Sequence, residues 1–125
     1  MNIEQGLITY LIAQNVANKR IYPSKLPQNA TLPAVVMKRV SQAVDYVQSG
    51  ASGLEMGRFQ LDIWGTTYAS VKTVKAQVLT AVSGFKGVMG SATVGASFIA
   101  NAVDMNDPDS QLIREVVDVK IWSNL

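Results

Sequence analysis

The sequence contains no histidine and no cysteine among its 125 residues. These two absences exclude Ser-His-Asp and Cys-His nucleophilic sites, the usual zinc ligands and a disulfide framework. A catalytic site would have to be built from carboxylates or lysines alone. Because no disulfide can form, we expect the stability of the chain to come from packing or from assembly.

Charge is also scarce. Charged residues make up 16% of the chain, the formal net charge is +2, and the basic residues are spread along the sequence. This pattern lacks the basic footprint that nucleic acid or an anionic membrane requires. No apolar run reaches the roughly 18 residues of a membrane span, and the apolar stretch Leu7–Ala13 has no basic leader. We therefore expect protein partners, with no membrane and no sequence-specific nucleic acid.

A hydrophobic content of 48% in 125 residues suits one compact domain over residues 1–125. At the centre of the chain, the spacing of apolar residues changes from a period of two to a period of 3.6 residues. The segment Arg58–Trp64 alternates as a strand with one buried face does, and Gly65 ends it. A helix then begins with Thr66 or Thr67 as its cap and continues to Val82. Its apolar stripe consists of Val71, Val74, Val78 and Val82.

The chain before this centre predicts a helix and a strand. A helix from Asn2 to about Asn15 is favoured by a capping-box arrangement with Gln5. Gly6 weakens this helix by roughly 1 kcal/mol relative to alanine, which packing can override. The next segment, Arg20–Pro33, holds three prolines and predicts a short extended piece followed by an irregular loop. The β-branched residues of 34–41 then predict a strand.

The segment Gln42–Gly57 is polar and glycine-rich, and it is longer than an ordinary hairpin link. We interpret it as a long loop that is mobile in the free monomer and makes contacts with partners. A second loose region, 84–90, follows the central helix. The remaining segments predict a strand over Val94–Val103, a turn over Asp104–Ser110 and a final strand over Ile113–Trp122. The order of elements predicts an α+β fold, with a mostly antiparallel sheet of about four to five strands and two helices packed on one face.

No pattern in the sequence predicts a catalytic, cofactor or metal site. Asp62 lies in mid-strand, where an exposed or salt-bridged role is the usual one for an acid. The acidic turn after Asp104 resembles a calcium loop, but Pro108 takes the place of a ligand and Asp109 the place of the required glycine. The glycines of 84–91 lack the residue order of a phosphate-binding loop.

The two tryptophans have two possible roles. Strand alternation places Trp64 and Trp122 on the sheet face opposite Phe59, Leu61 and Ile63. Large aromatic residues occur both in cores and at protein interfaces. If the helices cover one face, the other face is available to a neighbouring subunit.

Several local patterns occur in order along the chain and together resemble the tail completion proteins of long-tailed bacteriophages and prophages. The resemblance spans nearly the whole sequence. It is carried by Arg20-Ile21-Tyr22-Pro23, by Leu32-Pro33 before Val35-Val36 and Ser41, by Arg58, Gln60, Asp62 and Trp64 before Tyr68, and by Arg114, Asp118 and Trp122.

The resemblance implies a small α+β structural protein at the head-proximal end of a long tail. Such a protein caps the tail tube and takes part in joining tail to head as a hexameric ring, with no catalytic site and no cofactor. The implied partners are the tail tube protein and head-tail connector proteins, and the implied location is the virion tail, after assembly in the host bacterial cytoplasm. Whether the free chain is a monomer in solution stays open.

We expect interface residues on the polar segment, on the sheet and among the arginines. Arg39, Arg58 and Arg114 could pair across subunits with Asp45, Glu55 or Asp118, although isolated surface pairs are weak. The full set of expected contact residues is Arg39, Asp45, Tyr46, Val47, Leu54, Glu55, Arg58, Trp64, Arg114 and Trp122.

Two alternatives belong to other classes of protein. The first is a small non-enzymatic binding module that docks a partner protein through a sheet edge. The second is an enzyme, which would need a concave pocket lined by Asp62 or Glu55.

Overall fold

The fold is one six-stranded sheet with two α-helices and a short 3-10 helix. A computed structural model describes residues 3–47, 50–90, 92–107 and 112–124, and it places the side chains of these residues except those of 41–47, 50–54, 105–107 and 124. In chain order, the elements are α1 (Ile3–Ala13), η1 (Val16–Lys19), β1 (Ile21–Pro23), β2 (Ala34–Val47), β3 (Gly50–Gly65), α2 (Tyr68–Val82), β4 (Gly87–Met89), β5 (Ala92–Asp107) and β6 (Leu112–Asn124).

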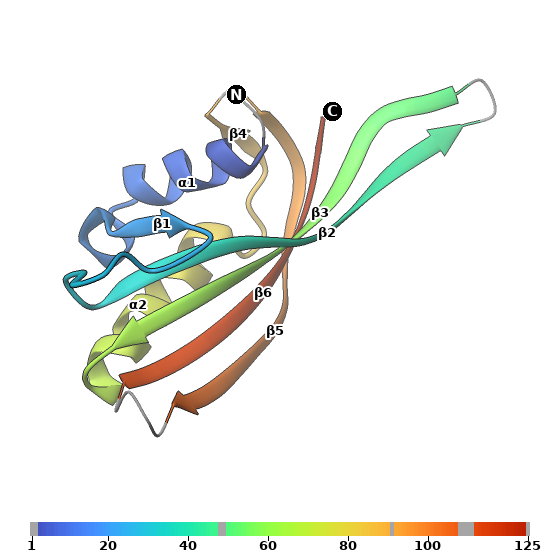
Figure 1. Cartoon of the computed structure of the whole chain (residues 1–125). Coiled ribbons are helices and arrows are strands. Elements are labelled where there is room, and N and C mark those ends of the chain that lie inside the picture. Colours follow the sequence, from blue (N-terminus) through green and yellow to red (C-terminus); the bar gives the residue numbers. More distant parts are fainter. Residues whose placement is uncertain (1–2, 48–49, 91, 108–111, 125) are drawn as a thin grey trace.

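The strands lie in the order β1-β2-β3-β6-β5-β4. β1 pairs in parallel with β2, and every other pairing is antiparallel. The sheet twists strongly and curls around the helices, which lie on the same side of it (Figure 1). The predicted α+β class is confirmed. The predicted strand number is too low, because the three-residue strands β1 and β4 are too short to show a period in the sequence.

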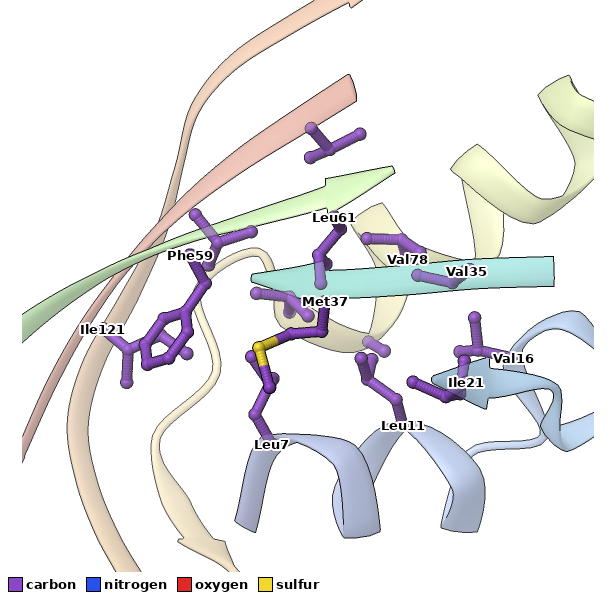
Figure 2. Packing of buried hydrophobic residues seen from close by; sticks show 14 of the residues in the cluster. Leu7, Leu11, Val16, Ile21, Val35, Met37, Phe59, Leu61, Val78 and Ile121 are labelled. Carbon is purple, nitrogen blue, oxygen red and sulfur yellow. The ribbon is translucent and has the colours of Figure 1, made fainter. Parts of the chain in front are cut away.

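The core fills the space between the helices and the inner face of the sheet. Figure 2 shows Leu7 and Leu11 of α1 pointing toward the sheet, where Phe59 and Leu61 of β3 are fully buried. From α2, the predicted apolar stripe is buried, and the predicted cap is present because Thr67 Oγ1 accepts a hydrogen bond from the Ser70 amide at 3.2 Å. The remaining elements contribute, among others, Val16, Ile21, Val35, Met37, Val74, Val78, Met89, Val94, Val117 and Ile121.

The N-terminal elements agree with the sequence analysis. α1 ends at Ala13, two residues before the expected end, and the predicted Asn2 cap lies outside the described residues. The short extended piece is β1, and the irregular loop follows it to the start of β2.

The prediction of a long loop over 42–57 is wrong. β2 continues to Val47 and β3 begins at Gly50, so this segment is a β-hairpin. The turn predicted from Asp104 is wrong in its first half, since β5 continues to Asp107, and residues 108–111 lie outside the described part of the chain. In both places, pairing with a neighbouring strand outweighs a polar or glycine-rich composition.

The first prediction concerns Gly6, which allows α1 to lie directly against β4. A Cβ atom at Gly6 would collide with the main-chain oxygen of Met89. We expect Gly6→Ala to lower the free energy of unfolding by about 1–3 kcal/mol, because the clash outweighs the gain in helix propensity. Urea denaturation measures this change. Thr9→Ala, at an exposed position of α1, is the matched control and should leave stability equal or higher. A Gly6→Ala variant as stable as the original protein would contradict the close packing.

Candidate assembly surfaces

The most prominent surface feature is the outer part of the β2–β3 hairpin. β3 pairs with β6 only from Leu54 to Gly65, so residues 45–47 and 50–53 form a two-stranded ribbon that no other described strand joins. We call these residues the arm. The arm projects beyond the rest of the sheet (Figure 1). Asp45, Tyr46 and Val47 lie on it and Leu54 lies at its base, with side chains outside the described set.

The sheet face away from the helices, which we call the outer face, carries a buried ion pair. The Arg114 guanidinium donates from Nη2 to Asp62 Oδ2 at 2.7 Å, and Gln60 Nε2 donates to Asp62 Oδ1 at 2.7 Å. Arg114 also lies over the ring of Trp64, 5.1 Å from its centroid. Asp62 is therefore salt-bridged, one of the two roles expected for it, and it is buried rather than exposed.

This network fixes residues that the sequence analysis assigned to contacts. Removing one partner of a buried ion pair typically costs about 3–5 kcal/mol, because the other charge stays buried without compensation. Arg114 and Trp64 are thus tied into the fold of their own chain, since β6 places Arg114 directly opposite Trp64 in the ladder. Their contribution to a contact would come from the outer surface of the stacked pair.

The other expected arginines also have partners within the chain. Arg58 Nη2 lies 3.4 Å from Asp118 Oδ2 across β3 and β6, and Arg39 Nε lies 2.8 Å from Glu4 Oε1, which links β2 to α1. Both pairs are partly exposed, so each contributes at most about 1 kcal/mol. Glu55 is buried. Each of the three arginines therefore already pairs with an acid of its own chain, and this pairing would compete with the expected pairing across subunits.

An aromatic patch remains exposed on the outer face. Trp122 is 38% exposed and Phe98 of β5 is 53% exposed. In the register of β5 and β6, Phe98 faces Lys120 and Ala96 faces Trp122, so the two aromatic residues are diagonal neighbours. The tryptophan was expected on this face, whereas Phe98 was not singled out. The alternation of β5 was the one available signal for it.

A second polar cluster joins α2 to the inner face of the sheet. The buried Glu115 carboxylate accepts from Lys72 Nζ at 3.0 Å and from Lys75 Nζ at 2.9 Å, and Lys72 also donates to Asp104 Oδ1 at 2.7 Å. The lysines are three residues apart on one helix, so both reach the same acid. The sequence analysis missed this cluster, although the alternation of the last strand places Glu115 on the side of Val117.

The helices themselves enclose only an open groove. It has a volume of about 690 Å³ and lies between α1 and α2, where Tyr10 donates from its hydroxyl to the Ala81 carbonyl at 2.6 Å. Neither Asp62 nor Glu55 lines it. Among the described residues, no group of three or more acids could hold a metal ion. Within the same part of the chain, no helix is long and apolar enough to cross a membrane. The groove is lined by Tyr10, Gln14, Lys72, Thr73, Ala76, Gln77, Thr80 and Ala81.

The fold is shared with a chain of a virion particle. A chain from a solved structure described as the virion of a native gene transfer agent (GTA) particle superposes with a TM-score of 0.64. The match covers 92% of this chain and 84% of that chain at 15% identity, so it speaks for the fold alone. No curated protein matches the sequence.

The family follows from the sequence itself. The family model described as tail completion protein gp17 matches residues 7–124. The chain belongs to this family and is a structural protein of a bacteriophage-type tail. The resemblance drawn from the ordered sequence patterns is thereby confirmed.

The second prediction is a pH dependence of stability that originates in the cluster on α2. The hydrogen bond from Lys72 lowers the pKa of Asp104 from its usual 3.8, and the hydrogen bonds to Asp104 and Glu115 raise the pKa of Lys72 above its usual 10.5. Asp104 thus contributes stability that is present above about pH 4 and is lost as the pH falls through its lowered pKa. The contribution of Lys72 is complete below pH 10.5 and is lost at more alkaline pH.

The acid side is tested by urea midpoints measured from about pH 7 down to about pH 2, the range over which carboxylates titrate. Asp104→Asn and Lys72→Met should each flatten the decline of stability below pH 4. Lys86→Met removes an exposed lysine elsewhere and should leave the decline unchanged. An unchanged slope in both cluster variants would show that the pair does not couple to folding.

Proposed function

We propose that this tail protein sits at the head-proximal end of the tail, caps the tail tube and joins tail to head as a hexameric ring. Membership of the tail completion family supports a place among other tail or head proteins. The projecting arm is the single structural observation that supports a ring, because it reaches beyond the body of the subunit toward whatever lies beside it (Figure 1).

Within the part of the chain that the structure describes, no third strand lies beside the arm. A two-stranded ribbon is marginally stable in water unless a third strand, a helix or a partner covers it. The arm lies beyond the last β3–β6 pair of the described residues, Leu54 with Asn124. Contacts with a neighbouring copy would supply the missing cover, and a closed ring would supply it to every copy at once.

The surfaces away from the arm suit stacking partners. The outer face presents Phe98 and Trp122 between charged side chains, and aromatic residues are enriched at protein contacts. The tail tube protein and the head-tail connector proteins are the two partners that a terminal ring would meet. Since the charged side chains on this face are largely paired within the chain, these contacts would depend on shape and on aromatic area.

The third prediction tests the arm. We replace residues 45–54 with Asn-Gly, which closes the pair of Val44 and Glu55 with a two-residue turn. The shortened protein should keep its circular dichroism spectrum and its cooperative unfolding, because the arm contributes no residue to the described core. It should lose the ring-sized species that the original protein forms at high concentration.

Size-exclusion chromatography with light scattering, from micromolar to millimolar protein, makes this comparison. If the shortened protein still forms rings, the arm is not the contact. If the original protein stays monomeric over the whole range, the ring itself is contradicted. Unfolding of the shortened protein would show that the arm belongs to the fold rather than to an interface.

A further inference from the structure

Two long strand edges of the sheet lack a neighbour among the described residues. β1 pairs with β2 only at residues 35–37, so β2 is open on that side from Lys38 to Val47. β4 pairs with β5 only at residues 92–94, and the Ser97 carbonyl on the same side accepts a hydrogen bond from the Gly84 amide at 2.9 Å, so β5 is open from Phe98 to Asp107. An open edge presents a row of backbone N–H and C=O groups that can pair with another strand.

The open edge of β5 has little of the protection that soluble monomers give to such edges. From Phe98 to Val103 it holds no charged residue and no proline, and its two acids, Asp104 and Asp107, lie at the far end. Phe98 is 53% and Val103 41% exposed. Only two register shifts, one at Gly95 and one at Ala100, interrupt its ladder with β6. A strand edge that is uncharged and partly apolar over most of its length marks a place where another strand adds.

We propose that the open edge of β5 in one copy pairs with the open edge of β2 in the next copy. This inference rests on the ring of the proposed function and names its subunit contact. Both edges belong to the same chain and lie on opposite sides of the sheet, so the contact is head-to-tail. Head-to-tail contacts leave one edge free at each end until a ring closes.

The direction of the strands fits this contact. β2, β3, β6 and β5 alternate in direction along the sheet, so a copy added in the same orientation brings its β2 antiparallel to β5. That direction places Lys38 at the start of one open edge opposite Asp107 at the end of the other. Lys38 forms no ion pair within the described residues, and Asp104 lies in the same acidic end of β5.

The lengths of the two edges fit as well. With Lys38 opposite Asp107, the open stretch 38–47 extends along β5 to about residue 98. β4 of one copy then lies beyond one end of the junction, and β1 of the next copy lies beyond the other end. The two short strands therefore limit the junction without obstructing it, and the arm of each copy lies along β5 of its neighbour.

The fourth prediction uses the edge itself. Val103→Lys should raise the protein concentration needed for half-assembly by about ten-fold or more, because a lysine on a strand edge opposes the addition of another strand. Val88→Lys is the matched control, since Val88 is an exposed valine of β4 outside the junction, and it should assemble as the original protein does. Phe98→Lys is a second variant on the same edge. Thermal unfolding of each monomer confirms that the fold is intact.

Cross-linking identifies the partner edge without ambiguity, because the chain contains no cysteine. The register shift of β2 between Arg39 and Ser41 takes up one residue, so Ala43 of one copy lies opposite Val103 of the next. Ala43→Cys chains mixed with size-tagged Val103→Cys chains should form mixed disulfide dimers under oxidation, and neither variant should cross-link alone. Cross-linking of Val103→Cys with itself would show a two-fold β5–β5 contact and overturn the inference. Rings that persist in both lysine variants would overturn it too and would leave the ring standing. A chain that is monomeric throughout would contradict the ring and the junction together.

Discussion

The architecture depends on a sheet that is covered on one face only. β3 lies between β2 and β6, and its apolar residues Phe59, Leu61 and Ile63 are buried against the helices. No described helix or strand covers the opposite face (Figure 1), so it must be compatible with water and still keep its strands in register. The Asp62–Arg114 pair, stacked on Trp64, meets both demands because it joins β3 to β6 through charged groups. The polar outer face is thus a consequence of the one-sided core.

The same constraint explains why the contacts of this protein would depend on backbone and aromatic groups. The arginines that looked available in the sequence have acids within the chain, and the lysines of α2 are held by Glu115. Among the described residues, the arm lacks a third strand, and the edges of β2 and β5 lack a neighbour over most of their length. In the proposed ring, a subunit of this kind would keep its charges paired within the chain and would cohere through its strand edges.

Periodicity was sufficient for the elements that have one clear apolar face. It located β3, α2 with its Thr67 cap, and β6, because their side chains alternate or recur against a core. It failed for the hairpin after Ser41 and for β4, which are rich in glycine and polar residues and show no apolar alternation. These strands form because their backbone groups pair with a neighbouring strand. The Glu115 cluster was missed for a related reason. Its members Lys72 and Glu115 are brought together only by the packing of α2 on β6.

The two tryptophans are intrinsic fluorescent probes of one face of the sheet. The chain has only two, and both lie on the outer face, one stacked beneath an arginine and the other more open to solvent near Phe98. No tryptophan occupies the helix-covered core. Tryptophan fluorescence therefore reports on the uncovered side of the sheet. A partner that binds to that side would shift the emission maximum, whereas changes around α1 and α2 would leave it nearly unchanged.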